Sequence, residues 1–462
     1  MNASFSTVYS RALALFLLLL ILTVAPVATD LPGRLYAVRL PLILGGVLVL
    51  SLIYTAQVTR GQSLLSVLRA SRPSPLLLAG AAYGGWALIS ASQSPMSGYA
   101  FLGAPYLQFG SVMLVGCLCL GGLYSRAPLT RPLVVALQIS TAVMLVLTVL
   151  ESMGLRPLAA LIQSPRMTYP AALVGHRPHL GGWFAIMSLV PVFFYRNHPL
   201  DRGFWWWMGA AFAGLALATT SAATLGVLLG LLVWLALNLK TKRHAPLAPA
   251  AALILLIAAL FILPDVTRQA TVTLNLPAAG TKSYASTYTF QPRLLMWKAA
   301  ANGAAQRPVF GWGDETFAYH GFDLLSEAEA KRLFRLELGL PADQPLWYGG
   351  YTYYTRAKGE QDVSNGSIIY ARAHNVLADE AYSHGWVGLT LLFAFLALFV
   401  ARAYQSRSDG SYVLLATLPY SVYLLAWFFV PTVTPLFFIL LGVMVSELRS
   451  SASPSNLKEV IA

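Results

Sequence analysis

Charged residues are scarce in this chain of 462 residues. They make up 11% of it, about half of the share usual in soluble proteins, whereas 57% of the residues are hydrophobic. Eighteen acidic side chains cannot cover the surface of a soluble protein of 49.9 kDa, so most of the exterior must face lipid. The composition excludes an ordinary soluble protein and predicts an integral membrane protein.

Cysteine is rare in the chain, and common nucleotide-binding and nucleophile motifs are absent. The two cysteines, Cys117 and Cys119, lie two positions apart in one apolar run, where they cannot form an ordinary disulfide. The chain has no P-loop, no dinucleotide-binding fingerprint and no GxSxG nucleophile motif. A net charge of +13 would suit a nucleic acid, but the basic residues are dispersed among the connections between apolar runs. We therefore expect no nucleic-acid partner.

Apolar runs are abundant, and most approach the roughly 20 residues that a helix needs to cross a bilayer. Twelve of them predict an all-α polytopic membrane protein, with spans near residues 12–29, 40–57, 75–92, 106–124, 131–152, 179–195, 204–220, 222–239, 246–263, 385–404, 411–430 and 432–447. We expect four parts: spans one to nine within 1–263, a loop domain at 264–375, spans ten to twelve within 376–447, and a tail at 448–462.

The basic residues predict the orientation, because Lys and Arg resist transfer across the membrane. With the N-terminus in the cytoplasm, fifteen of the 31 lie in cytoplasmic segments, and the outer connections after spans three, seven and eleven contain none. Both termini are then cytoplasmic. The connection 264–373, with eleven basic and ten acidic residues, lies outside and is too long to be structureless.

Two features stand out in this loop domain. Ser326 and Glu329 form a capping box that predicts a helix through Leu338, ended by Gly339 and Pro341. Residues 346–354 are unusually aromatic, which suits either stacking on sugar rings or the membrane interface, and we favour the interface.

The segment Arg372-Ala373-His374-Asn375 closes the loop domain and is followed, nine residues later, by Gly385-Trp386-Val387-Gly388. A histidine can accept a proton near neutral pH, and the entrance to a helix bundle is sheltered yet reachable, so His374 is a candidate general base. The alternative is a polar residue at a helix start, with Asn375 as the cap. Asp379 or Glu380 could orient His374 or pair with Arg372. The glycines alone indicate close helix packing.

Arginines on the outer side form the second candidate group. Guanidinium groups donate paired hydrogen bonds to phosphate oxygens, so they suit a diphosphate, although each could instead anchor a lipid headgroup. His176 and His179 could share a metal, but no cysteine or carboxylate is close in sequence, so we expect no metal site there. The outer basic residues in question are Arg156, Arg166, His176, Arg177, His179 and Arg293.

These residues resemble those of the O-antigen ligase and polymerase superfamily. His374-Asn375, nine residues and Gly385-x-x-Gly388 match the motif near the end of the large periplasmic loop of the ligases. Arg293, Trp297, Pro308 and Gly311-x-Gly313 resemble the pattern that precedes it. The stretch 175–181 follows the family only loosely, so either Arg166 or Arg177 could hold the family's upstream arginine role.

The resemblance implies a GT-C-like glycosyltransferase of the bacterial inner membrane. It implies an O-antigen ligase, which moves O-antigen from undecaprenyl diphosphate to a lipid A-core sugar at the periplasmic face by an inverting reaction without a metal or other cofactor. The implied partners are the lipid-linked O-antigen, the lipid A-core oligosaccharide and membrane lipids. His374 would be the general base, and the implied substrate-binding residues are Arg166, Arg177, Arg293, Arg372 and Asn375.

Other activities remain open at this point. An O-antigen polymerase and a protein O-oligosaccharyltransferase use the same donor and differ in the acceptor. A lipid or solute transporter is an alternative of another class, which the nearly uncharged spans disfavour, because intramembrane charges would be expected to line a transport path.

Overall fold

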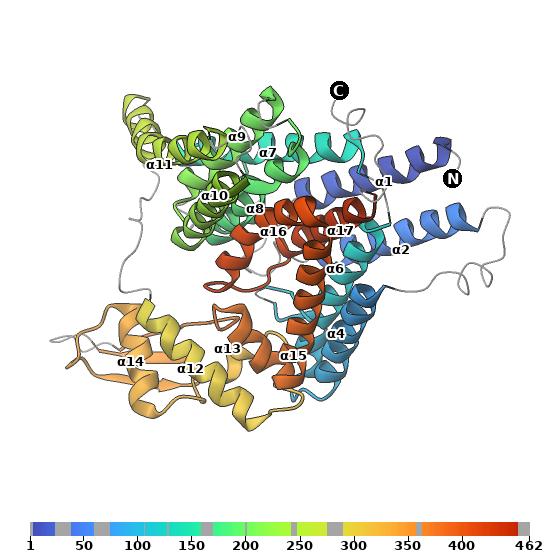
Figure 1. Cartoon of the computed structure of the whole chain (residues 1–462). Coiled ribbons are helices and arrows are strands. Elements are labelled where there is room, and N and C mark those ends of the chain that lie inside the picture. The colour runs from blue at the N-terminus through green and yellow to red at the C-terminus, as the bar shows by residue number, and fades with distance from the viewer. Residues whose placement is uncertain are drawn as a thin grey trace.

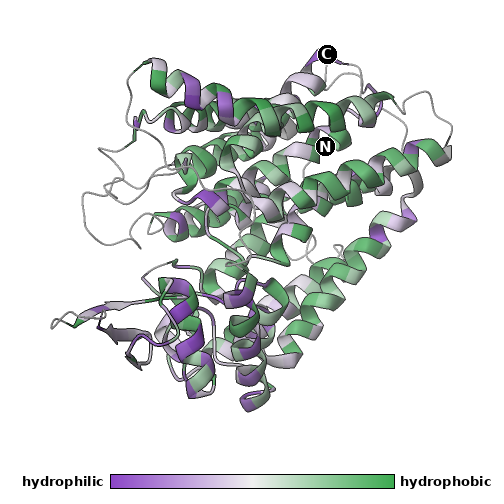
Figure 2. Ribbon diagram, turned by 90° about the vertical axis from the view of Figure 1, so that its left-hand side faces the viewer, coloured by the Kyte–Doolittle hydropathy of each residue, from purple (hydrophilic) through white to green (hydrophobic). Residues whose placement is uncertain are grey.

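The structure has an apolar helix bundle and a smaller, more polar part beside one end of it (Figure 1). This computed structural model describes residues 3–23, 38–59, 74–105, 107–126, 129–158, 170–198, 201–241, 247–274, 290–356 and 363–450. The two parts differ in hydropathy: hydrophobic residues dominate the bundle, and hydrophilic residues gather in the smaller part (Figure 2). We refer to residues 290–373 as the loop domain.

Each of the twelve apolar runs overlaps one helix of the bundle. These helices are α1 (Ala3–Leu22), α2 (Arg39–Val58), α4 (Pro75–Ser92), α6 (Ser111–Tyr124), α7 (Arg131–Ser152), α8 (Arg177–Phe194), α9 (Arg202–Ala218), α10 (Ser221–Thr241), α11 (Leu247–Thr273), α15 (Val376–Gln405), α16 (Arg407–Leu424) and α17 (Thr434–Ser450), with the short α5 (Ser97–Leu102) and η2 (Ala172–Val174) between them. Within the described ranges, six of them are long and apolar enough to cross a membrane, namely α2, α4, α7, α10, α11 and α15. The chain is therefore a helical membrane protein, while the count of twelve spans stays a prediction.

Helix α8 forms the centre of the bundle. Every residue from His179 to Phe194 is buried, and α9, α10 and α16 pack around the helix. A helix that is apolar on all sides is suited to such an interior position. Its N-terminus brings Arg177 and the residues before it close to the connection between α16 and α17.

Several helix boundaries differ from the sequence prediction, among them that of α1, which spans Ala3–Leu22 and not 12–29, and two further differences have a local explanation. Helix α11 continues to Thr273, although we expected span nine to end at residue 263. Pro264 lies inside it without ending it, and Thr267 Oγ1 donates to the carbonyls of Leu263 and Pro264 at 3.0 Å in the turn that follows the proline. Helix α15 begins at Val376 and not at 385, because the polar residues after the loop domain already form helical turns.

The loop domain has its own core beneath a small sheet. It contains α12 (Phe290–Gln306), α13 (Phe317–His320), α14 (Glu327–Leu338) and the antiparallel strands β1 (Leu346–Gly349), β2 (Thr352–Thr355) and β3 (Ser364–Ser367) in the order β1-β2-β3. Phe322 stacks on Phe334 at 4.3 Å within this core. The prediction of α14 is confirmed: Ser326 and Glu329 form the capping box, and Gly339 ends the helix with φ 65°.

The aromatic stretch 346–354 forms β1 and β2, so its rings alternate between two faces. Tyr348 and Tyr353 pack against Phe334 at 5.4 and 5.9 Å. Their strand neighbours Trp347 and Tyr354 are paired across the sheet and are 52% and 44% exposed. Packing explains Tyr348 and Tyr353, and contact with sugars or lipid remains a prediction for the exposed pair Trp347 and Tyr354.

A break in α15 positions the segment that carries His374. Gly385 has φ 68°, and a Cβ there would lie 2.3 Å from the carbonyl oxygen of Val309, so only glycine fits. Residues 311–313 run along the turn before the break, where Trp312 and Gly313 donate to the carbonyls of Tyr382 and Ser383 at 2.8 and 2.9 Å. The first turns of α15 are therefore fastened to the loop domain.

Candidate functional site

His374 lies in the short connection between the loop domain and α15. Its Nδ1 lies 3.0 Å from the carbonyl oxygen of Arg372, and its backbone has a left-handed φ of 57°. The half-buried ring makes edge contacts with Trp427 at 4.7 Å and Phe428 at 5.0 Å. Burial first, and then the charge of Arg293, lower the pKa of His374 to about 3, so the imidazole is neutral at physiological pH.

Arg293 approaches the same tryptophan from α12. Its guanidinium carbon lies 5.8 Å from the centre of the Trp427 ring, a cation–π contact that holds a cation next to His374. Burial lowers the pKa of Arg293, but arginine remains charged at any physiological pH. Trp297, one turn further along α12, donates from Nε1 to the carbonyl oxygen of His374 at 3.3 Å.

The start of α8 forms the third side of this arrangement. His176 stacks on Trp427 at 6.1 Å, and His179 meets the same ring edge-on at 6.0 Å. Arg177 donates from Nη1 to Thr219 Oγ1 at 2.9 Å and is half-buried. We call the side chains gathered around Trp427 the Trp427 cluster; they are His176, His179, Arg293 and His374.

Asn375 caps α15. Its Oδ1 accepts from the backbone N–H groups of Leu377 and Ala378 at 2.9 and 3.1 Å, and its Nδ2 donates to the carbonyl of Leu425 at 2.7 Å. These contacts correspond to the helix-cap alternative that the sequence left open. They give the expected substrate-binding role of Asn375 no support.

The side chain of Arg372 makes its hydrogen bonds outside the Trp427 cluster, and the residue is 1% exposed. Its Nη1 donates to Asp379 Oδ2 at 2.7 Å, and its Nη2 donates to Asp314 Oδ1 at 3.1 Å and to the carbonyl of Phe109. Of the two acids considered as its partner, Asp379 is the one that pairs with it. A guanidinium enclosed in this way does not reach a substrate, so we do not retain Arg372 as a binding residue.

A second buried histidine extends this set of charges. His384 Nε2 lies 3.1 Å from Asp314 Oδ2, and its Nδ1 lies 2.8 Å from Glu380 Oε2. Both ring nitrogens face carboxylates, which the imidazolium satisfies with two donors. Burial alone would raise the pKa of Asp314, but the charges of His384 and Arg372 outweigh it and lower that pKa to about 2.

Glu315, the neighbour of Asp314, holds the α5–α6 connection. Its carboxylate accepts from the backbone N–H of Phe109 at 2.6 Å and of Gln108 at 3.1 Å, and also from that of Ala104. Burial is the main cause that raises the pKa of Glu315 to about 7, although Arg372 acts in the opposite direction.

One residue named from the sequence, Arg166, lies outside the described residues, so the choice between Arg166 and Arg177 stays a prediction. Within the described ranges, no group of three His, Cys, Asp or Glu side chains lies together in a way that could hold a metal ion.

Comparison with protein families gives the assignment. The O-antigen ligase family model matches residues 206–393, a range that includes Arg293, His374 and the Gly385-x-x-Gly388 motif. This match supports the assignment of the chain to the O-antigen ligase and polymerase superfamily that the sequence resembles. The family indicates a glycosyltransferase-like enzyme, and the apolar helices indicate a membrane protein. Among the curated proteins, none matches the chain.

Three functional candidates were missed from the sequence. Trp427 lies within the apolar run 411–430 and carries no signal of its own, because its importance comes from the side chains that surround it. Asp314 directly follows Gly311-x-Gly313, and His384 directly precedes Gly385. For Asp314 and His384, the position next to a family motif was the sequence signal that could have identified them.

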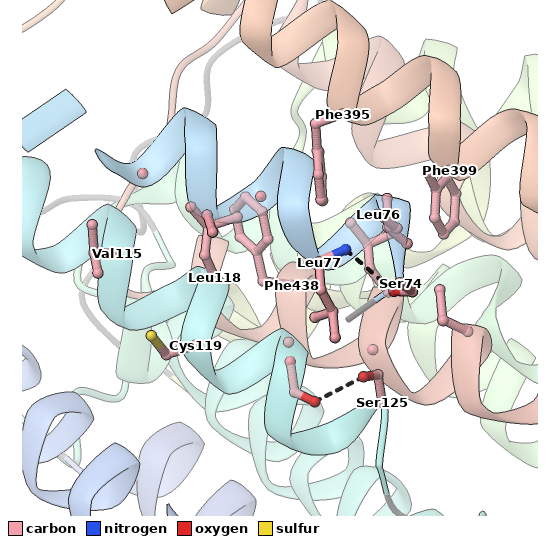
Figure 3. A pocket seen from close by; sticks show the side chains of 18 of the residues that line it. Ser74, Leu76, Leu77, Val115, Leu118, Cys119, Ser125, Phe395, Phe399 and Phe438 are labelled. Carbon is pink, nitrogen blue, oxygen red and sulfur yellow. Dashed lines mark hydrogen bonds between the residues drawn. The ribbon is translucent and has the colours of Figure 1, made fainter. Parts of the chain in front are cut away.

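The structure also has an apolar cavity of about 440 Å³ far along α15 from the break (Figure 3). Phe395 and Phe399 of α15, Leu118 of α6 and Phe438 of α17 lie on its wall, and none of the lining residues is charged. Without a proton acceptor or a cation it does not suit sugar transfer, so we place the candidate site at the Trp427 cluster.

Proposed function

We propose that this chain is an O-antigen ligase, which transfers O-antigen polysaccharide from undecaprenyl diphosphate to a sugar of lipid A-core at the periplasmic face of the bacterial inner membrane. One observation carries this proposal: His374, the cation Arg293 and His176 all contact the ring of Trp427. A proton acceptor next to a fixed cation is what an attack by a hydroxyl on a diphosphate-linked sugar requires.

The hydrogen bond of His374 selects the atom that acts as the base. A carbonyl oxygen can only accept, so the contact with Arg372 favours the tautomer with the proton on Nδ1, in which Nε2 is able to receive a proton. A base with a pKa of about 3 is weak. An incoming diphosphate would oppose the charge of Arg293, which raises the pKa of His374 at the stage where the base is needed.

The reaction is then a single displacement. The acceptor hydroxyl oxygen attacks the anomeric carbon from the side opposite the diphosphate, and its proton passes to Nε2 of His374. The bond between the anomeric carbon and the diphosphate oxygen breaks, and its electron pair leaves with the diphosphate. Arg293 and Arg177, together with Arg166, bind the departing charge, and the configuration at the anomeric carbon is inverted.

Guanidinium groups can supply the charge that a metal ion supplies in other transferases, so we propose a metal-independent reaction. Thorough chelation tests this clause. Transfer that continues at the same rate supports it, and transfer that is lost and then restored by one divalent ion overturns it.

The central experiment uses purified protein with lipid-linked oligosaccharide and lipid A-core, and it measures ligation, chain lengthening and transfer to protein separately. Ligation is expected as the main product; chain lengthening would identify a polymerase, and protein glycosylation an oligosaccharyltransferase. His374→Ala should reduce ligation by about 10²- to 10⁴-fold, the usual contribution of a general base. The matched control is His198→Ala, which lies beyond Phe194 at the C-terminal end of α8, a helix about 27 Å long at 1.5 Å per residue, whereas the Trp427 cluster lies at its N-terminal end. Equal ligation by both variants, at equal abundance, would remove the base from the scheme.

The periplasmic location is tested separately. Glu327 of α14 is exposed on the loop domain, whereas Cys117 is buried and Cys119 faces outward from an apolar helix. A Glu327→Cys variant should react with a membrane-impermeant maleimide in intact spheroplasts. Labelling that requires permeabilised cells would place the loop domain in the cytoplasm.

A further inference from the structure

A buried ion network is connected to His374 through Arg372, whose carbonyl oxygen contacts Nδ1 of His374. Its members are Arg372, Asp379, Asp314, His384 and Glu380, each no more than 2% exposed. Asp314 bridges the two cations, since one of its oxygens accepts from Arg372 and the other faces His384 Nε2, both at 3.1 Å. The network joins the start of α15 to the segment that follows Gly313.

Stability alone is a poor explanation for this network. Removing charged groups from water costs more than a buried pair commonly returns, and well-packed apolar side chains of similar size often stabilise a fold better. The two cations are each held by two carboxylates, an arrangement that fixes directions as well as distances. A role in fixing local geometry accounts for both properties.

The geometry that the network fixes is that of the His374 backbone. Asp379 holds the Arg372 side chain with Oδ2 and accepts from the backbone N–H of Ala373 with Oδ1 at 3.3 Å. Two successive residues before His374 are therefore clamped to one carboxylate. His374 itself has φ 57°, a strained conformation for a residue with a side chain, which persists only where the surroundings enforce it.

We propose that Asp379 and Asp314 are positioning residues for His374, a proposal that rests on the function argued above. Both carboxylates bind the Arg372 guanidinium, and this holds the carbonyl oxygen of Arg372 against Nδ1 of His374. The imidazole is thereby kept in the tautomer with the proton on Nδ1, and Nε2 is left to accept a proton. The titratable and charged groups that face His374 are Arg293 from α12, His176 and His179 from the start of α8, and Tyr370 from its own loop.

The tautomer can be measured without any reaction. Solid-state NMR of the full chain with ¹⁵N-labelled histidine, compared with the His374→Ala variant, isolates the signals of this one ring. We expect an unprotonated Nε2 and a protonated Nδ1 in the parent at neutral pH. A proton on Nε2 in the parent would overturn the proposal, whatever the variants do.

Asp379→Asn tests the clamp. We expect a mixture of tautomers and a fall in kcat of about 10- to 100-fold, the range typical for loss of a group that orients another, while KM for the lipid-linked donor stays within about twofold. The matched control is Glu327→Gln, which removes a carboxylate from the exposed pair with Lys331. It should change neither quantity.

Arg372→Lys covers the case in which Asp379→Asn does not fold. An ammonium keeps the buried charge but has no planar fork to reach Asp379 and Asp314 together, so the same effects are expected. A folded variant of either kind with the parental tautomer and kcat refutes the positioning role. If His374→Ala abolishes ligation while the network variants do not impair it, only the positioning role fails. If His374→Ala retains ligation, the proposed function fails first.

Discussion

Trp427 provides the sharpest test of the site, because it contacts every member of the Trp427 cluster. It makes an edge contact with His374, a cation–π contact with Arg293 and a stacking contact with His176. Such contacts contribute about 0.5–1.5 kcal/mol each beyond the burial of area. Replacing the ring with an aliphatic side chain should therefore cost about 2–3 kcal/mol of positioning energy, or about 30- to 150-fold in kcat/KM.

The assay compares ligation by Trp427→Leu and Trp427→Phe with that of the parent. Leucine fills part of the space without a ring, whereas phenylalanine keeps a ring for His374 and Arg293 to contact, so its loss should be several times smaller. Trp206→Leu, on α9 at a half-exposed position, controls for the loss of a tryptophan. Thermal denaturation of each variant separates unfolding from loss of activity. A folded Trp427→Leu protein with parental kcat/KM would refute the reasoning.

Protonation and backbone geometry give three more predictions. With a pKa of about 3, His374 should limit kcat/KM only below about pH 4. Arg293→Gln should raise that pKa and shift the acidic limb of the pH profile of kcat/KM to higher pH. An acidic limb at pH 6.5 in the parent would contradict this. Glu315, with its pKa raised to about 7, binds its proton more tightly in the folded chain, so its contribution to stability is greatest below pH 4.5 and is lost as the pH rises through 7. Glu315→Gln should flatten this dependence in thermal denaturation, and an unchanged slope would count against it. Gly385→Ala should cost about 2 kcal/mol or more because of its φ of 68° and the close carbonyl, whereas Gly85→Ala, which meets open space within α4, should be neutral or slightly stabilising; equal thermal midpoints would argue against the strain.

Much of the fold was predictable because its signals are local. Apolar runs located the helices of the bundle, and the capping box of Ser326 and Glu329 located α14, since both patterns depend on neighbours within a few turns. The end of α11 was predicted too early because a proline commonly ends a helix, whereas Pro264 lies inside α11. Thr267 donates to two carbonyls in the turn after this proline. The start of α15 was placed too late because its first turns are polar.

The candidate site was predictable only in part. Spacing and resemblance drew attention to His374, Arg293 and the stretch around Arg177, and the structure brings these segments together around one ring. No sequence pattern showed that Arg372 would be enclosed by two carboxylates. The identity of the ring, Trp427, depended on contacts between distant segments, which a single sequence does not display.

The loop domain cannot work as a detached module. It carries Arg293 and leads into His374, but the aromatic surface against which both rest is supplied by the far end of the polypeptide, and His176 comes from a stretch more than a hundred residues upstream of α12. Exchanging this domain between relatives would thus transfer only part of the candidate site. A working chimera should need the matching tryptophan and α8 entrance from the same parent, which makes these distant stretches a single unit for engineering.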